Sequence, residues 1–133
     1  MLFRSSIDDE VENAKLAKQA FDEAGIPTSR YRLISGNSRE IVTKLADSLY
    51  DLFILRKTED LLESIESAHR SLRPGGILVL DKALLSGKVA DPTQRDESTI
   101  ALREAIKVIK EARELWLSML LPVGDGVLVA TKL

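Results

Sequence analysis

Residues 50–81 read YDLFILRKTEDLLESIESAHRSLRPGGILVLD, and this stretch decides the fold class. It opens with a nearly continuous apolar run over 50–55, which is typical of a strand buried on both faces. Helical spacing follows, with apolar residues at 61, 62, 65, 68 and 72, and Thr58 is the predicted N-cap. The RPGG run at 73–76 predicts a turn, and a second buried strand over 77–80 ends in Asp81. Strand, helix and strand in this order predict parallel pairing.

The same alternation extends upstream. We predict a strand over 2–7, then a helix opened by a capping box of Asp9 and Glu12 and ended before Gly25 and Pro27. A second strand over 31–34 is followed by a short helix, with Asn37 and Glu40 at capping-box spacing.

Downstream, the polar stretch 86–98 is too long for a plain connector, which favours a functional or lid-like loop. We expect the charges of 91–98 to lie in solvent. A helix is predicted over 99–112, followed by strands over 115–121 and 127–131 around a turn at 122–126.

Together these elements predict one α/β domain over 1–133. It is a Rossmann-like, mostly parallel sheet with helices on both faces and a C-terminal antiparallel β-hairpin. Ligands of such sheets lie beyond the carboxyl ends of the strands. Asp8 and residues 36–38, 55–57 and 81–84 therefore form the candidate rim.

Composition excludes several classes of function. The 133 residues carry 19 Lys and Arg against 21 Asp and Glu, so no basic field favours nucleic acid or an anionic membrane. One His and no Cys exclude disulfides, a thiol nucleophile and a cysteine zinc site. The N-terminus lacks the apolar core of a signal peptide, and no apolar run is long enough for a membrane span. We therefore expect a cytoplasmic protein.

Two longer stretches resemble a known family. LRPGGILVLDKALLSGKVADP at 72–92 and LLPVGDGVLVATK at 120–132 are similar to the bacterial catechol and caffeoyl-CoA O-methyltransferases, which are class I S-adenosylmethionine-dependent enzymes. The resemblance implies transfer of a methyl group from S-adenosylmethionine to a hydroxyl of a small, catechol-like acceptor. It covers essentially the whole chain.

The resemblance also implies roles for residues at the first two strand ends. Asp8 matches the acid that receives the ribose hydroxyls of the cofactor, although a helix N-cap is an equally simple interpretation of this residue. Gly36, Asn37 and Ser38 match the loop that meets the adenine, and a turn followed by a cap explains the same residues.

Two departures from the family weaken this interpretation. The first family strand and its glycine-rich loop have no counterpart, so we expect a truncated chain or a sheet whose gap is closed by direct pairing or by another chain. At the family's divalent-cation ligands, Leu55 or Arg56 replaces an Asp and Asp81-Lys82 replaces an Asp-Asn pair. A lone carboxylate beside cations repels Mg²⁺, so we expect no divalent metal. Lys82 either pairs with a carboxylate or orients an anionic or phenolic acceptor.

The remaining expectations concern activity and assembly. The alternative to an enzyme is a catalytically silent homologue that serves as a binding or assembly subunit. Residues 115–121 are apolar on both faces, so we expect a homodimer, with Trp116 packed in the core or at the dimer contact. His69 has no triad partner at a recognisable spacing, and we expect it to be structural.

Overall fold

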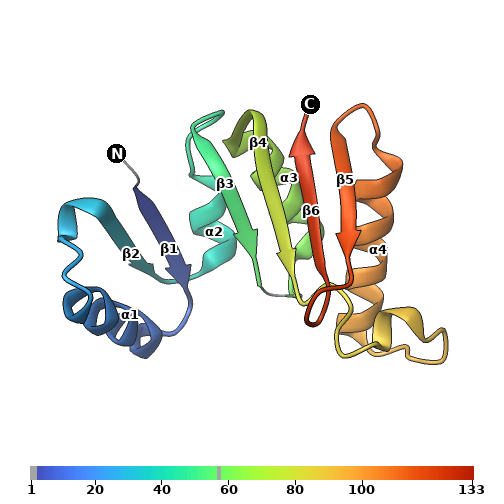
Figure 1. Ribbon diagram of the computed structural model, residues 1–133, viewed down its shortest axis with the longest axis horizontal. Coiled ribbons are helices and arrows are strands. Elements are labelled where there is room, and N and C mark those ends of the chain that lie inside the picture. The colour runs from blue at the N-terminus through green and yellow to red at the C-terminus, as the bar shows by residue number, and fades with distance from the viewer. Residues whose placement is uncertain (1–2, 57) are drawn as a thin grey trace. The chain divides into compact units, whose positions relative to one another are not determined.

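The computed structural model describes residues 3–56 and 58–133, so Leu2 in the first predicted strand and Lys57 on the predicted rim lie outside the described residues. The chain divides into two compact units, residues 1–44 and 45–133 (Figure 1). Within the described ranges, every helix is too short or too polar to cross a membrane.

The first unit is a βαβα arrangement. Its elements are β1 (Arg4–Asp8), α1 (Val11–Glu23), a 3-10 turn η1 (Thr28–Arg30), β2 (Tyr31–Ser35) and α2 (Ser38–Thr43). The two strands pair in parallel, with Arg4 opposite Tyr31 and Asp8 opposite Ser35. The predicted strand and helix order of this segment is confirmed.

The two helices of this unit begin differently. Asn37 caps α2 as predicted, because its side chain accepts a hydrogen bond from the Glu40 backbone N–H at 3.4 Å. The predicted capping box of α1 is wrong, since the helix starts after Glu10 without a side-chain cap. Asp9 instead accepts the backbone N–H of Ser38 at 2.8 Å, which ties the two connections together.

The second unit contains a mixed sheet. Its elements are β3 (Tyr50–Leu55), α3 (Leu61–Ser71), β4 (Leu72–Asp81), the 3-10 turn η2 (Lys88–Ala90), α4 (Glu97–Glu111), β5 (Trp116–Leu121) and β6 (Val127–Lys132). The strand order is β3-β4-β6-β5, with β3 and β4 parallel and the other two pairs antiparallel. The α/β class and the terminal hairpin are confirmed. Within the described residues β1 pairs with β2 and β3 pairs with β4, and closure of the gap by direct pairing or by another chain stays a prediction.

The segment between α3 and the core of β4 differs from the prediction. RPGG is not a separate turn, because β4 begins at Leu72 and the four residues form its irregular start, where the register to β3 shifts. Gly75 has φ +79°, and a Cβ on Gly76 would lie 2.8 Å from the Arg73 carbonyl oxygen. The strand therefore passes here only because both positions are glycine.

The start of α3 also corrects a prediction. Thr58 does not cap this helix, whose N-cap is Asp60 in the left-handed region at φ 50°. The Thr58 hydroxyl donates instead to Ser98 Oγ at 3.2 Å. This bond links the connection after β3 to the first turn of α4.

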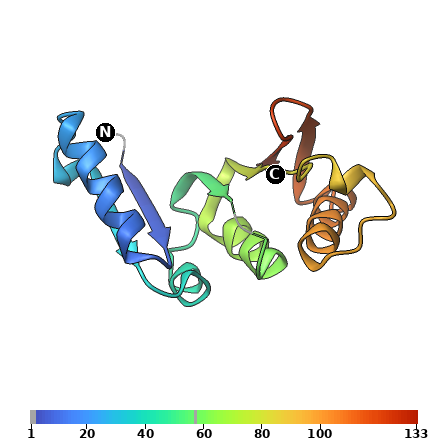
Figure 2. The ribbon, with the colours of Figure 1, turned by 90° about the horizontal axis from the view of Figure 1, so that it is seen from below.

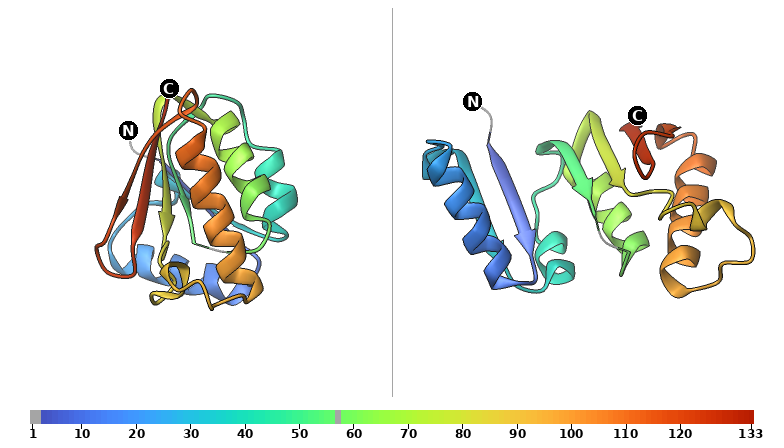
Figure 3. Two further views of the ribbon diagram at one scale, coloured as in Figure 1. Left: turned by 90° about the vertical axis from the view of Figure 1, so that its right-hand side faces the viewer. Right: turned by 60° about the horizontal axis from the view of Figure 1, so that its bottom comes forward.

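Helices α3 and α4 pack side by side on one face of the four-stranded sheet (Figures 2 and 3). The side chains between them and the sheet form one buried cluster that includes Leu72, Leu78, Leu80, Leu102, Ile109 and Leu128. Burial of this apolar surface is the main stabilising contribution to the unit. The cluster includes Leu55 at the end of β3 and Leu80 next to the end of β4, so core packing holds both strand ends in place.

The opposite face of the sheet is also apolar. The strand register places its side chains in two cross-strand rows: Leu52, Ile77, Thr131 and Leu117 in one, and Ile54, Val79, Val129 and Met119 in the other. Neither helix of this unit covers these rows, and the side chains of Leu117 and Met119 are 69% and 63% exposed. Leu52 and Ile54 on the other edge strand are also exposed, so both edges of this face present large apolar residues.

Candidate functional site

Asp8 lies at the carboxyl end of β1 and is held by the start of α1. Its Oδ1 accepts the backbone N–H of Glu10 at 2.8 Å, and the Asn13 side-chain amide lies 3.1 Å from both carboxylate oxygens. Asp8 therefore stabilises the entry to α1, although it is not the N-cap itself. The sequence analysis missed Asn13, whose spacing of five residues from Asp8 in a predicted helix was the available signal.

The loop after β2 lies beside Asp8, as the prediction of a common rim requires. The Gly36 N–H donates to the Asp8 carbonyl at 3.1 Å, and Asn37 and Ser38 follow directly at the start of α2. Gly36 has φ +146°, and an added Cβ would lie 3.3 Å from Ile41. A glycine is needed here for the backbone to approach its neighbour closely.

A cavity of about 140 Å³ adjoins this strand end, lined by Ser6, Asp8, Asn13, Ala14, Ala17, Leu33 and Ile34. Ligand pockets are usually roughly 300 Å³ or larger, so this one accommodates part of a ligand. The four predicted cofactor-binding residues are thus partly brought together: Asp8 lies on the cavity wall, Gly36 is bonded to Asp8, and Ser38 is bonded to Asp9.

The chemistry at Asp8 fits a ribose diol under one condition. A carboxylate offers about four lone-pair positions, and Glu10 with Asn13 makes three contacts to them. A diol that donates two hydrogen bonds therefore requires the Asn13 amide to turn away.

In the second unit, the candidate rim centres on Asp81 at the end of β4. Asp81 Oδ2 accepts from Arg56 Nε at 3.0 Å, and Oδ1 accepts from the backbone N–H of Lys82 at 2.9 Å. Leu55, the last residue of β3, points into the core and is buried. The structure therefore decides between the two sequence alternatives: Arg56 is the residue at the rim.

This arrangement does not fit a divalent cation. The described residues contain no group of three or more His, Cys, Asp or Glu side chains that could share a metal ion. Asp81 already binds a guanidinium, whereas Mg²⁺ and Ca²⁺ require several oxygen ligands. Among the described residues of this rim, the metal that the family resemblance implies therefore has no ligand set.

The loop after Asp81 begins with strained backbone. Lys82, Leu85 and Ser86 have φ between 47° and 54°, a left-handed conformation that is uncommon for residues with a Cβ. The adjacent Ala83 is fully buried, and its N–H donates to the Gly126 carbonyl at 2.9 Å. Strain of this kind persists only where surrounding structure imposes it.

The turn between β5 and β6 supplies that support. Besides the bond to Gly126, the Leu84 N–H donates to the Asp125 carbonyl at 2.9 Å and the Ser86 N–H to Asp125 Oδ1 at 2.5 Å. A Cβ on Gly126 would lie 2.4 Å from Leu84 Cγ. The two segments that carry the family resemblance therefore pack directly on each other.

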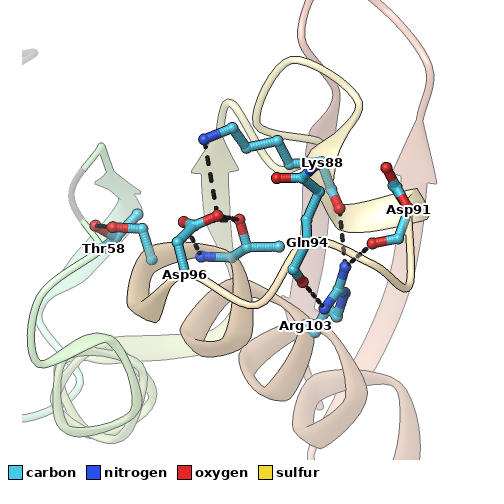
Figure 4. Close-up of polar contacts among 8 residues, drawn as sticks. Thr58, Lys88, Asp91, Gln94, Asp96 and Arg103 are labelled. Carbon is cyan, nitrogen blue, oxygen red and sulfur yellow. Dashed lines mark hydrogen bonds and ion pairs between the residues drawn. The ribbon is translucent and has the colours of Figure 1, made fainter.

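Arg103 on α4 organises the rest of this loop (Figure 4). Its guanidinium donates to the carbonyls of Lys88 and Val89 at 2.9 Å, of Gln94 at 2.6 Å, and of Asp91. Arg95, Asp96 and Glu97 are exposed, as expected, while the backbone of the loop is held because these carbonyls converge on one side chain. Sequence reasoning missed Arg103 because nothing in the helical pattern distinguishes it from other charged residues.

Two aspartates fix the turns of the same loop. Asp91 accepts from the Thr93 hydroxyl at 2.7 Å and backbone N–H at 2.9 Å, which lowers the pKa of this carboxyl below its ordinary value. Hydrogen bonds from Thr99 likewise lower the pKa of Asp96, which is the N-cap of α4 (Figure 4). The helix therefore begins at Glu97, two residues before the predicted start.

His69 has a structural environment, as expected. Its ring lies edge-on to Trp116 with 5.0 Å between ring centroids, and Trp116 is buried in the core. Burial lowers the pKa of His69, and the nearby Lys132 ammonium lowers it further. Trp116 thus packs inward, which removes it as a dimer contact.

A second cavity, of about 420 Å³, lies on α4 and is lined by Val89, Arg103, Ile106, Lys107, Lys110, Glu111 and Arg113. None of the rim residues predicted from the sequence lines it. We therefore place the candidate site at the strand ends.

Comparison with known proteins gives a consistent assignment. Residues 5–133 match the sequence profile of a family described as O-methyltransferase. A protein of Mycolicibacterium paratuberculosis, provisionally named an O-methyltransferase, is 46% identical over 129 residues, or 96% of this chain and 58% of that protein.

Solved structures show the same fold. A Corynebacterium glutamicum protein is 37% identical with a TM-score of 0.88, over 96% of this chain and 59% of its own. The O-methyltransferase TomG of Streptomyces achromogenes, which is involved in tomaymycin synthesis and was crystallised with S-adenosylmethionine, is 23% identical with a TM-score of 0.81 over 96% and 60%. This chain spans less than two thirds of the length of these relatives.

Proposed function

Because this chain belongs to the O-methyltransferase family, we propose that it transfers the methyl group of S-adenosylmethionine to a hydroxyl of a small, catechol-like acceptor. The observation that carries the proposal is Asp8, a carboxylate at a parallel strand end beside the close backbone approach of Gly36. Acids at this place in α/β sheets receive ribose hydroxyls. The chain spans about 58% of the length of its mycobacterial relative, and its activity is accordingly a proposal.

Bound S-adenosylmethionine supplies an electrophilic methyl group, and the protein's task is to hold the two reactants in line. Asp8 is positioned by Glu10 and Asn13, so its oxygens face a fixed direction. Gly36, Asn37 and Ser38 border the same strand end, where the backbone can approach the adenine. Their contribution is to orient the cofactor, which lowers the entropic part of the activation barrier.

Kinetics with labelled S-adenosylmethionine and catechol test the proposal. Asp8→Ala removes two charge-assisted hydrogen bonds, each contributing about 1.5 kcal/mol or more, so KM for the cofactor should rise at least tenfold. Asp22→Ala is the matched control, because it removes an exposed carboxylate of α1 that pairs with Lys18. An unchanged KM in the Asp8 variant, with both variants folded, contradicts the assignment.

The alternative is a silent homologue that binds without transferring a methyl group. The lone Asp81, occupied by Arg56, favours this alternative because the family's cation ligands are absent at the described rim. The same assay separates the two: S-adenosylhomocysteine binding without transfer to any of a panel of phenols supports the silent form. Measurable turnover excludes it.

A further inference from the structure

We propose that the rim of the second unit works without a divalent cation and holds the anionic acceptor oxygen, a phenolate, through Arg56. This inference deepens the proposed function and rests on it. It follows from the pairing of Arg56 with Asp81, from the contrast with a similar pair at the other end of the same strands, and from the position of Lys82.

Arg56 is suited to a ligand because only part of its guanidinium is used. Its Nε donates to Asp81 Oδ2, while the side chain is 70% exposed. A guanidinium carries five N–H donors in a planar fork that matches an oxyanion. Asp81 is therefore a positioning residue that aims the terminal N–H groups of Arg56.

The other end of the β3–β4 pair provides an internal comparison. There Arg73 Nε donates to Asp51 Oδ1 at 2.5 Å, so an arginine and an aspartate on the same two strands make the same bond. The Asp51 side chain is 78% exposed, whereas that of Asp81 is 34% exposed and is also held by the Lys82 N–H. The second contact differs: at the carboxyl end it holds the Asp81 carboxylate, whereas at the other end the Arg73 guanidinium itself also donates to the Pro74 carbonyl at 3.0 Å. The carboxyl-end pair lies where parallel sheets bind ligands.

Lys82 adds a second positive charge at this end. Its left-handed backbone is imposed by Ala83, which is buried and bonded to Gly126. Arg56 and Lys82 carry two positive charges and Asp81 carries one negative charge, so the net charge of these three side chains is +1. The local charge therefore repels a dication and attracts an anion.

Methyl transfer to the acceptor oxygen can be written without a metal ion. The acceptor hydroxyl loses its proton to solvent water, a step that nearby cations favour because they stabilise the phenolate. An electron pair of the phenolate oxygen then forms the bond to the methyl carbon. The carbon–sulfur bond breaks with its electron pair going to sulfur, so the positive sulfonium becomes a neutral thioether.

Absorbance titration of 4-nitrocatechol tests the inference without turnover, because the ionised probe absorbs at a longer wavelength. We expect the intact chain to lower the apparent pKa of the probe by about half a unit to one unit, with no change on adding EDTA or Mg²⁺. Arg56→Gln should abolish the shift and Arg56→Lys should retain most of it. Arg73→Gln, the matched control, should leave it unchanged.

The outcomes separate this inference from the proposed function. A shift that needs Mg²⁺, a wild-type chain that produces no shift, or an Arg56→Gln variant with the wild-type shift overturns the inference. Titration of the same samples with S-adenosylhomocysteine reports on the cofactor site independently. Thermal melting of each variant verifies folding, and Arg56→Lys keeps the test valid if Arg56→Gln does not fold.

Discussion

His69 illustrates how one buried side chain makes stability depend on pH. Its pKa is lowered mainly by burial against Trp116 and further by Lys132, so the fold favours the neutral ring. Below about pH 6.5 the unfolded chain binds a proton more readily than the folded chain does. The contribution of neutral His69 to the free energy of unfolding is fully present above pH 6.5. It is lost as the pH falls toward the pKa that His69 has in the folded protein.

We therefore expect the melting temperature to fall as the pH drops below 6.5, and His69→Gln to flatten this part of the profile. Trp116 is the single tryptophan of the chain, so its fluorescence reports on the neighbouring ring. A fluorescence titration with its midpoint at or above pH 6.5 in the folded protein contradicts the account.

Single residues also show where sequence reasoning reaches its limit. Asn37 is a cap in both the pattern and the structure, because its contact to Glu40 is local. Asp9 fits the same pattern but bonds to Ser38, twenty-nine positions away. Local spacing cannot distinguish the two, since the competing partner comes from another element.

At the scale of elements, the turn between β5 and β6 supports the loop after β4. Gly126→Ala brings a Cβ within 2.4 Å of Leu84 and retains φ +79°, so we expect a loss of about 2 kcal/mol or more in the free energy of unfolding. Gly124→Ala, where φ is +57° and the space is open, should lose about 1 kcal/mol. Urea unfolding of both variants measures the difference, and equal losses would show that the contact with Leu84 is unimportant.

Arg103 connects a helix to the same loop. Replacement with Met leaves four carbonyls without this donor, so we expect a loss of about 1–3 kcal/mol and faster tryptic cleavage after Lys88 and Arg95. Lys107→Met, a change of equal chemistry on the same helix, is the control. Cleavage at the wild-type rate in the Arg103 variant would indicate that other contacts hold the loop.

The elements themselves were largely predictable, because apolar runs and helical spacing depend on neighbouring residues. Strand β3 matches its predicted bounds, whereas β4 begins five residues earlier than expected. Glycine and proline at 73–76 are typical of turns, but here they form an irregular strand start. The Arg103 contacts were unpredictable because they join residues 9 to 15 positions apart through a loop of undefined path.

At the scale of the whole molecule, the apolar outer face of the four-stranded sheet is the feature that favours association. The apolar composition of residues 115–121 predicted an apolar outer face. The structure shows that Leu117 and Met119 face outward while Trp116 faces the core. Exposed apolar rows on four strands favour burial against a partner. We propose a second copy as that partner, because closed homodimers are the commonest soluble assemblies.

We expect light scattering at micromolar concentration to give about twice the 14.7 kDa chain mass. The double substitution Leu117→Glu with Met119→Glu should shift the protein toward the monomer. Val108→Glu, at an exposed apolar position of α4, is the control. A wild-type chain that is monomeric and melts cooperatively contradicts the proposal, whereas Trp116→Glu is uninformative because that residue is in the core.

Calorimetric titration with S-adenosylhomocysteine tests most directly whether the strand end at Asp8 holds the cofactor. We predict one site per chain, at least tenfold weaker binding for Asp8→Ala, and equal or tighter binding for Asn13→Ala, which frees the carboxylate. The absence of binding heat across several temperatures in a folded chain, or the same affinity in the Asp8 variant, would contradict the account.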